Sequence, residues 1–253
     1  MLSVLIPVRN EGINLAIMLK MLKAMVEVPH EVLVVYDDAA DDDVPVIAAL
    51  RESYPHLRGV HNRLGRGVVR AIEAGVAEAH GEYVLIFAAD EVGPVLAIDH
   101  MLSLVKDGCD FVSCTRYAHG GRRLGGSWIG GILSRVANAL FYVVSSSALT
   151  DVTTGIKMFR RAVFDQLKPQ ANPVGWAVAF ELGIKAQLLG LKLGEVPIIS
   201  IDRLYGGKSS FRPGPWCVEY LRWFFWGAIQ LRRLRGGKRP PVRICDPRRS
   251  LPR

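Results

Sequence analysis

The first 90 residues alternate between short runs rich in β-branched and aliphatic residues and longer stretches with helical spacing of apolar residues. The runs with strand character are 2–7, 31–36, 59–62 and 82–88, and the stretches with helical character are 11–26, 43–54 and 67–80. This order is typical of a parallel sheet with helices on both faces. We therefore predict an α/β, Rossmann-like fold with a mostly parallel sheet, in which ligands bind at the carboxyl ends of the strands.

The second half of the chain has a less regular pattern. We predict a strand at 111–115, a glycine-rich loop at 120–131, a helix at 132–144, a short ordered segment at 155–159, a helix at 179–189 and a strand at 195–201. No internal repeat or low-complexity linker interrupts the chain, so we expect a single domain at 1–212. We expect an amphipathic helix at 213–234 to follow, and then a basic tail at 235–253 without regular structure.

The charge of the chain is concentrated at its end. The 253 residues carry a formal net charge of +8. Residues 232–253 hold nine Lys and Arg against one acid, Asp246, which leaves 23 basic and 23 acidic residues in the preceding 231. A cationic tail suits an anionic membrane surface. Aromatic residues are not interleaved with the cations, and we therefore expect no nucleic-acid partner.

The remaining composition favours a protein of a reducing compartment. The four cysteines have neither zinc-ligand spacing nor a disulfide pattern. The N-terminus shows no secretion signal. The apolar runs 128–149 and 223–231 are interrupted by Arg135 or shorter than the roughly 20 residues of a membrane span. We expect a cytoplasmic protein, peripheral on the inner face of the membrane.

The helix expected near the C-terminus has two interpretations. Its apolar side is aromatic and its other side carries charged and polar residues, with Trp216, Tyr220, Trp223, Phe224 and Leu231 at helical spacing. Such a helix can pack on the domain. It can equally lie in a membrane interface, because Trp and Phe backed by cations are typical of in-plane helices.

Polar residues follow each early strand, where the sheet would bind a ligand. They are Arg9, Asn10 and Glu11, then Asp37 and Asp38, then Asn62, and finally Asp90 and Glu91. In the acidic run 37–43, Asp37 and Asp38 stand at a strand end and are candidate ligand contacts. Asp41 and Asp43 are interpreted as the solvated start of a helix, where carboxylates favour the helix dipole.

Two further groups suggest a phosphate-containing ligand. A carboxylate at Asp90 can hold a divalent cation against a diphosphate, although aspartates at loop starts are often ordinary turn residues. The second group is basic and lies in or near glycine-rich segments, where Arg offers bidentate contacts to phosphate. Its members are Arg116, Arg122, Arg123, Arg135, Arg203 and Lys208. A solvated basic surface is the alternative interpretation of this group.

An ordered set of motifs spans roughly residues 2–211. They are P-V-R-N-E at 7–11, V-V-Y-D-D at 34–38, N-R-L-G-R-G at 62–67, G-E-Y-V at 81–84, T-R-Y at 115–117, S-R-V-A-N at 134–138, D-V-T-T-G-I-K at 151–157, F-E-L at 180–182, E-V-P-I at 195–198 and R-L-Y-G-G-K-S at 203–209. In this order they resemble family 2 glycosyltransferases of the GT-A fold. The most similar branch comprises dolichol-phosphate mannosyltransferases and other polyprenyl-phosphate glycosyltransferases.

The resemblance implies an inverting transfer of a hexose from a nucleoside diphosphate sugar, GDP- or UDP-linked, to a polyprenyl phosphate or related lipid-linked acceptor. It implies Mg²⁺ or Mn²⁺ at Asp90 and Glu91. The catalytic residues it implies are Asp90, Arg116, Arg203 and Lys208. The nucleotide-sugar contacts it implies are Pro7, Arg9, Glu11, Asp37, Asp38, Arg66 and Asp90. The acceptor-phosphate contacts it implies are Arg116, Ser134, Arg135, Arg203 and Lys208.

Three departures from the family pattern leave an alternative open. Where the family has D-A-D-L-Q, this chain has Ala88, Asp90 and Val92 at the ligand positions, so only Asp90 remains. Ala39 and Ala40 replace the glycine and serine of D-D-G-S, and Lys precedes Ser in the last motif. The alternative is a degenerate, non-catalytic protein of the same fold that binds a nucleotide sugar or acts as a scaffold.

Overall fold

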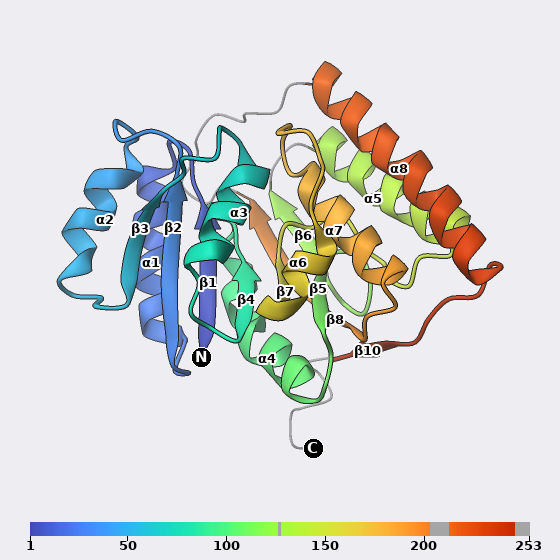
Figure 1. Cartoon of the computed structure of the whole chain (residues 1–253), viewed down its shortest axis with the longest axis horizontal. Coiled ribbons are helices and arrows are strands. Elements are labelled where there is room, and N and C mark those ends of the chain that lie inside the picture. The colour runs from blue at the N-terminus through green and yellow to red at the C-terminus, as the bar shows by residue number, and fades with distance from the viewer. Residues whose placement is uncertain (126–127, 203–212, 246–253) are drawn as a thin grey trace.

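The computed structural model describes residues 1–125, 128–202 and 213–245, and its centre is an eight-stranded sheet (Figure 1). Across the sheet the strands are β10 (Val242–Ile244), β8 (Leu193–Pro197), β5 (Phe111–Thr115), β7 (Lys157–Arg160), β4 (Tyr83–Ile86), β1 (Leu2–Pro7), β2 (His30–Tyr36) and β3 (Leu57–His61). Neighbouring strands are parallel except that β7 runs antiparallel to β4 and to β5. The predicted α/β fold with a mostly parallel sheet is confirmed.

Helices cover both faces of this sheet. They are α1 (Gly12–Met25), α2 (Asp43–Arg51), α3 (Val68–Glu78), α4 (Ile98–Lys106), α5 (Trp128–Ser145), α6 (Phe164–Leu167), α7 (Ala177–Leu188) and α8 (Pro213–Arg235), with the short 3-10 turns η1 (Gly93–Ala97) and η2 (Arg161–Val163). Strand β1 serves both faces because successive side chains alternate. Val4 and Ile6 belong to one buried cluster with Leu15 of α1. Leu5 belongs to the other with Ile72 of α3.

Helices α5 and α8 pack together with α7 on the second face (Figure 1). The Phe141 ring of α5 lies 5.3 Å from the Phe224 ring of α8 and 4.9 Å from the Phe180 ring of α7. Gly227 permits the approach of α8 to α7, because a Cβ at this position would lie 2.6 Å from Ile184 Cδ1. No helix of the described residues combines the length and apolar character needed to cross a membrane.

A second, two-stranded parallel sheet corrects two predictions. It pairs β6 (Arg122–Gly125) with β9 (Ile199–Asp202). The predicted loop at 120–131 therefore contains a strand, and α5 begins within the same range. The predicted strand at 195–201 divides at Ile198 into β8 and β9, which belong to different sheets. The apolar run looked continuous, and nothing in it indicated that the strand changes partner.

The segment that follows α8 also differs from the prediction. Val242–Ile244 forms β10, which pairs in parallel with β8, so the expectation of a tail without regular structure is wrong for these residues. Arg239 is also tied to the domain, because its guanidinium lies 3.9 Å from the centre of the Tyr142 ring. The edge of β8 offers unpaired backbone groups that three extended residues can satisfy. A strand this short leaves no periodic pattern in the sequence.

Candidate nucleotide and phosphate site

The carboxyl ends of the central strands form the candidate site. Strand order reverses between β1 and β4, since β2 and β3 lie on one side of β1 and β4 lies on the other. Doubly wound sheets bind ligands in the crevice at such a reversal. Arg9 and Glu11 follow β1 there, and Asp90 follows β4. The sheet therefore gathers polar residues that are far apart in the sequence.

Asp37 closes a loop beside this crevice. Its carboxylate accepts hydrogen bonds from Asn62 Nδ2 at 2.7 Å and from the Gly67 backbone N–H at 2.9 Å. Asn62 Nδ2 also donates to the Gly65 carbonyl at 2.6 Å. Gly67 has φ of 109°, a backbone conformation that favours glycine. We call residues 62–67 the nucleotide loop, after the nucleotide contact predicted for Arg66, and Asp37 holds the loop in shape.

Asp38 and Arg66 face solvent instead. Their side chains are 61% and 81% exposed, and Asp38 Oδ2 lies 3.8 Å from Arg66 Nη2. Asp38 Oδ1 accepts the Ala40 backbone N–H at 3.0 Å. The two aspartates at the end of β2 thus differ: Asp37 builds the loop, and Asp38 is accessible to a ligand.

The interpretation of Asp41 and Asp43 as a solvated helix start is wrong. They are only 7% and 0% exposed. The Asp41 carboxylate accepts the Asn10 N–H at 3.1 Å, and Asp43 Oδ2 accepts the Glu11 N–H at 3.2 Å. The first N–H groups of a helix lack partners within the helix, and carboxylates from a neighbouring segment can satisfy them. The two aspartates therefore fix the turn that carries Arg9 and Glu11.

The two buried aspartates of this cluster differ in their pKa values. Burial and the neighbouring Asp41 raise the pKa of Asp43 to about 8. Burial also opposes ionisation of Asp41, but hydrogen bonds from Asp43 and from the backbone bring the pKa of Asp41 below its ordinary value. One ligand atom each from Asp41, Asp42 and Asp43 lies within 4.8 Å of the others, a spacing consistent with a divalent cation. Asp41 and Asp43 already accept backbone N–H groups, so the cluster acts first as a structural clamp.

Asp90 and Glu91 follow β4 at the crevice and are both partly exposed. Glu91 Oε1 accepts a hydrogen bond from Ser200 Oγ of β9 at 3.1 Å. A carboxylate is the hard oxygen ligand that Mg²⁺ and Mn²⁺ prefer. Ala88 supplies no ligand, so the protein offers few oxygens here. This set fits a cation that takes most of its ligands from a diphosphate and water, because Mg²⁺ usually keeps several waters.

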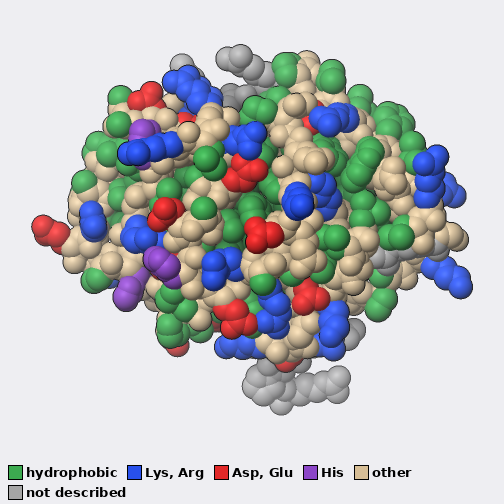
Figure 2. Space-filling model, viewed as in Figure 1, with side chains coloured by type: hydrophobic (Ala, Val, Ile, Leu, Met, Phe, Trp, Pro, Cys, Tyr) green, Lys and Arg blue, Asp and Glu red, His purple; other side chains and the backbone are tan. Residues whose placement is uncertain are grey.

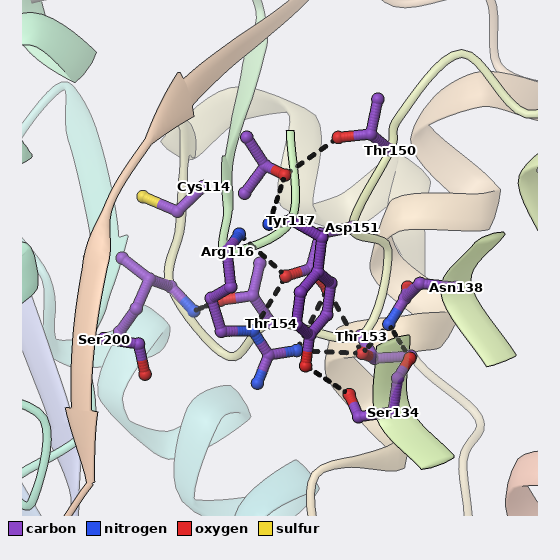
Figure 3. A network of polar contacts seen from close by, with 12 residues as sticks. Cys114, Arg116, Tyr117, Ser134, Asn138, Thr150, Asp151, Thr153, Thr154 and Ser200 are labelled. Carbon is purple, nitrogen blue, oxygen red and sulfur yellow. Dashed lines mark hydrogen bonds and ion pairs between the residues drawn. The ribbon is translucent and has the colours of Figure 1, made fainter. Parts of the chain in front are cut away.

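A buried ion pair lies at the end of β5 (Figure 3). Arg116 Nε and Nη2 donate to the two oxygens of Asp151 at 2.7 and 3.0 Å, and Nη2 also donates to Thr153 Oγ1 at 3.1 Å. The side chains are 11% and 0% exposed. Burial opposes ionisation of Asp151, but Arg116 outweighs it and lowers the pKa of that carboxyl. The guanidinium is therefore oriented before any ligand binds.

Helix α5 joins this network. Asn138 Nδ2 donates to Thr153 Oγ1 at 2.8 Å, and the Val152 N–H donates to Asn138 Oδ1 at 3.0 Å. Ser134 Oγ accepts the Tyr117 hydroxyl at 2.9 Å. Arg135 is exposed, and its guanidinium lies 5.9 Å from the centre of the Tyr117 ring. The predicted acceptor residues Arg116, Ser134 and Arg135 thus surround one tyrosine.

Two buried charges support the segment behind Arg116. Glu195 accepts the Thr150 N–H and hydroxyl, both at 2.8 Å. Lys157 is 0% exposed and donates to Ser113 Oγ at 2.7 Å and to the Val152 carbonyl at 3.1 Å. Burial lowers the pKa of Lys157 to about 8. Sequence reasoning quoted the motifs of these residues but gave them no role, although a charged residue within an apolar strand is a usable signal.

The remaining residues predicted for the site are Pro7, Arg9, Glu11, Arg203 and Lys208. Pro7 ends β1 and is buried, and Arg9 is exposed. Glu11 Oε2 accepts Asn14 Nδ2 at 2.9 Å. Arg203 and Lys208 lie outside the described residues. The ligand contacts assigned to all these residues stay predictions.

An α/β sheet with carboxylates near its strand reversal is the arrangement in which doubly wound sheets bind nucleotides and similar ligands. The sequence model of glycosyl transferase family 2 matches residues 3–168, more than half of the chain. The chain belongs to glycosyl transferase family 2.

Curated relatives agree with this family. A dolichol-phosphate mannosyltransferase of Pyrococcus furiosus is 26% identical over 87% of this chain and 61% of its own length. An undecaprenyl-phosphate 4-deoxy-4-formamido-L-arabinose transferase of Sodalis glossinidius is 25% identical over 82% of this chain and 62% of its own length. The chain thus spans less than two-thirds of the length of these relatives.

Solved structures share the GT-A fold. A glucosyl-3-phosphoglycerate synthase from Mycobacterium tuberculosis, in complex with Mn²⁺, UDP-glucose and phosphoglyceric acid, has a TM-score of 0.67 at 17% identity and covers 90% of this chain and 79% of its own. A mannosyltransferase from Pyrobaculum calidifontis, in complex with GDP-Man and Mn²⁺, has a TM-score of 0.60 at 18% identity, covering 90% and 64%. At these identities the likeness concerns the fold.

Proposed function

We propose that this protein transfers a hexose, with inversion, from a nucleoside diphosphate sugar to a polyprenyl phosphate or related lipid-linked acceptor. The observation that carries the proposal is the position of Asp90 and Arg116, which follow two strands of one sheet at the same edge. Glu91 and Arg116 are close enough for their charges to interact. A carboxylate for a metal-bound diphosphate and an oriented cation for a second phosphate are what such a transfer needs.

The protein's own residues divide the work. The nucleotide loop and Asp38 bind the nucleoside, and Arg66 lies beside Asp38 for the same ligand. Asp90, with Glu91, is the residue that would hold Mg²⁺ or Mn²⁺, which neutralises charge on the departing diphosphate. Two nitrogens of Arg116 are engaged by Asp151 and Thr153, and the third, Nη1, is the one we assign to the acceptor phosphate. A phosphate acceptor is already anionic, so no strong general base is required.

The names of the relatives support the acceptor class, since they include dolichol-phosphate and undecaprenyl-phosphate transferases. They do not favour the alternative of a non-catalytic scaffold. Arg203 and Lys208 remain proposed acceptor contacts on the strength of the family resemblance. The sugar and the base stay open between GDP- and UDP-linked hexoses.

The test is a transfer assay with a matrix of donors. Purified protein is incubated with labelled GDP-mannose, UDP-glucose or other UDP-hexoses, a polyprenyl phosphate in detergent, and Mg²⁺ or Mn²⁺. We expect a labelled lipid product with one donor, dependent on the lipid phosphate and abolished by a chelator. Donor binding without transfer to any lipid phosphate would favour the scaffold instead.

We further propose that the protein is peripheral on the inner face of the membrane, attached through α5 and α8. Both helices expose large apolar side chains, and Figure 2 shows hydrophobic side chains on the surface in the region of α8. On α5 these are Trp128, Ile132, Leu133, Val136, Leu140 and Val143, and on α8 they are Val218, Leu221, Phe225, Trp226, Ile229 and Leu234. Helical spacing gathers Val218, Leu221, Phe225 and Ile229 into one stripe of α8 and the α5 set into another, and Arg232 and Arg233 are exposed near the end of α8. Apolar stripes beside cations suit an anionic bilayer.

Vesicle binding tests this attachment. Deleting residues 232–253 would also remove β10 and the contact between Arg239 and Tyr142. The sharper variant replaces Arg232, Arg233 and Lys238 with Gln and keeps the strand. We expect weaker sedimentation with vesicles that contain phosphatidylglycerol and unchanged nucleotide binding. Equal vesicle affinity would contradict an electrostatic role for these cations.

A further inference from the structure

The segment 172–176, between α6 and α7, touches two functional loops. A Cβ on Gly67 of the nucleotide loop would lie 2.6 Å from Pro173 Cβ. A Cβ on Gly155, which follows the Asp151 segment, would lie 3.0 Å from Trp176 Cε3. Both glycines thus allow a direct backbone approach to this segment. A displacement of 172–176 would therefore be felt at both the nucleotide loop and the Arg116 network.

Helix α8 holds this segment through a buried carboxylate. Glu219 is 3% exposed and accepts the Asn172 backbone N–H at 3.0 Å and Asn172 Nδ2 at 2.7 Å. Trp223 Nε1 donates to the same carboxylate at 2.8 Å. Burial opposes ionisation, but the bonds from Asn172 and Trp223 outweigh it and lower the pKa of Glu219. The contact is therefore a set of charge-assisted hydrogen bonds, which are the stronger kind.

A second contact from α8 reinforces the first. The Trp216 ring lies over Gly175, where a Cβ would be 2.5 Å from Trp216 Cζ2. Gly175 also has φ of 54°, so its backbone shape and its lack of a side chain are both needed. Segment 172–176 is thus fastened to α8 at both ends.

The same turns of α8 expose apolar side chains on their outer side. Val218 and Leu221, which flank Glu219 in the sequence, are 70% and 53% exposed. One turn of helix therefore has an inner contact with segment 172–176 and an outer surface that is open to a partner. The path from that surface to the nucleotide loop runs through Glu219, Asn172 and Pro173.

We propose that Glu219 is a positioning residue that joins α8 to the nucleotide loop, so that attachment of α8 to a lipid surface and binding of the nucleotide strengthen each other. The inference rests on the proposed function, because it takes the nucleotide as the ligand of the loop and the bilayer as the partner of α8. A lipid surface restricts the motion of α8. The hydrogen bonds from Asn172 to Glu219 then restrict the neighbouring Pro173. Because Pro173 contacts Gly67, the last residue of the nucleotide loop, the motion of that loop is limited too. A ligand that meets an already ordered loop loses less conformational entropy on binding.

Thermodynamic linkage means that the proposed coupling can be measured either from nucleotide binding or from vesicle binding. If vesicles strengthen nucleotide binding by some factor, the nucleotide must strengthen vesicle binding by the same factor. Couplings of this kind are typically about 5-fold to 150-fold. We expect at least about 5-fold. Backbone hydrogen exchange at 62–67 should also slow when vesicles are added, in the absence of nucleotide.

The experiment measures GDP and UDP dissociation constants by calorimetry, with Mg²⁺, in the presence and absence of phosphatidylglycerol-containing vesicles. The variants are Glu219→Gln, which removes the charge that Asn172 binds, and Pro173→Ala, which leaves the bonds of Glu219 and the Cβ that faces Gly67 in place but removes the ring that fixes the Pro173 backbone. The matched controls are Glu181→Gln and Pro169→Ala. Glu181 is a 0% exposed carboxylate that accepts the Gln170 and Ala171 N–H groups but lies on α7. Pro169 lies in the same connection between α6 and α7.

We expect the vesicle-induced gain to fall to less than half of its wild-type factor in Glu219→Gln and Pro173→Ala and to persist in the two controls. If Glu219→Gln does not fold, Pro173→Ala decides. Vesicle and nucleotide binding that are both present but independent in the wild type would overturn the inference and leave the proposed function standing. A gain that survives both variants would also overturn it. Absence of vesicle binding would overturn the proposed membrane attachment, absence of nucleotide binding would overturn the proposed transferase function, and either result would overturn the inference.

Discussion

The carboxyl ends of β1 and β2 carry a site in which carboxylates hold backbone N–H groups, whereas the end of β5 carries one in which charged side chains hold each other. In the first region, Asp37 accepts the Gly67 N–H and Asp41 accepts the Asn10 N–H. In the second, Arg116 and Asp151 form a buried bidentate pair. The first arrangement shapes loops and leaves Asp38 in solvent. The second fixes the direction of a cation.

This difference predicts how each region responds to substitution. Asp37 is partly exposed, and its carboxylate can be neutralised with modest loss because the loop keeps the bond from Asn62 to the Gly65 carbonyl. A buried ion pair that loses one partner leaves a charge without compensation. We therefore expect substitutions in the second region to affect folding most, and those in the first region to affect binding and chemistry.

The largest effect should come from Asp151→Asn. The substitution leaves the Arg116 guanidinium buried without its carboxylate, a change of the kind that destabilises by about 3–5 kcal/mol. Urea unfolding followed by circular dichroism measures it. Asp38→Asn is the control, because its 61% exposed side chain makes a surface contact worth less than about 1 kcal/mol. A loss no larger than that of Asp38→Asn would break the comparison.

Asp90→Asn should act on chemistry instead of folding. Loss of the carboxylate that supports the departing diphosphate is expected to lower kcat by about 100-fold to 1000-fold, as when one stabilising group is removed from a transition state. The unfolding free energy should change little, because Asp90 is partly exposed. Asp99→Asn, an exposed position on α4, is the matched control for activity. An active Asp90→Asn protein would contradict the assignment of the metal site.

The same comparison explains what the sequence could reveal. Strand β1 has the predicted bounds, 2–7, Asp37 and Asp38 directly follow β2, and Asp90 lies in the loop after β4. These features are local, because apolar periodicity defines a strand and topology gathers the strand ends. The first region was therefore accessible from short stretches of sequence.

The second region depends on contacts between distant residues. Arg116 and Asp151 are 35 positions apart, and Thr150 and Glu195 are 45 apart. No local sequence pattern indicates which acidic side chain pairs with which basic one. The prediction that Asp41 and Asp43 are solvated failed for the same reason, since their partners lie at Asn10 and Glu11. The pairing of β10 with β8 could not be predicted either, because a strand of three residues has no recognisable sequence pattern.

Phe225→Ser should weaken attachment to vesicles. Phe225 is 61% exposed on α8, and withdrawal of a phenylalanine side chain from water contributes up to about 2–3 kcal/mol. We expect vesicle affinity to fall roughly 10-fold or more. Met25→Ser, at an exposed position at the end of α1, is the control. Equal losses in both variants would show that exposed apolar area in general, and not the α8 surface, drives the binding.

Asp43 should make the first region sensitive to pH. The pKa of Asp43 is about 8 in the folded protein, so the folded chain holds a proton that the unfolded chain releases above about pH 4. Its contribution to stability is complete below about pH 4 and is lost as pH rises toward 8, by up to about 1.4 kcal/mol per pH unit. The unfolding free energy of the wild type minus that of Asp43→Asn should therefore decline from about pH 4 to about pH 8. A difference that stays constant across this window would contradict a raised pKa of Asp43.

Lys157 should give the second region the opposite response at higher pH. Burial lowers its pKa from 10.5 to about 8, so between these values the unfolded chain holds a proton that the folded chain has released. Stability linked to this group therefore rises with pH across that window, since the unfolded state binds more protons. The unfolding free energy of the wild type minus that of Lys157→Met should increase from about pH 8 to about pH 10. A decline in the Lys157 difference would mean that the two regions do not differ in the sign of their pH response.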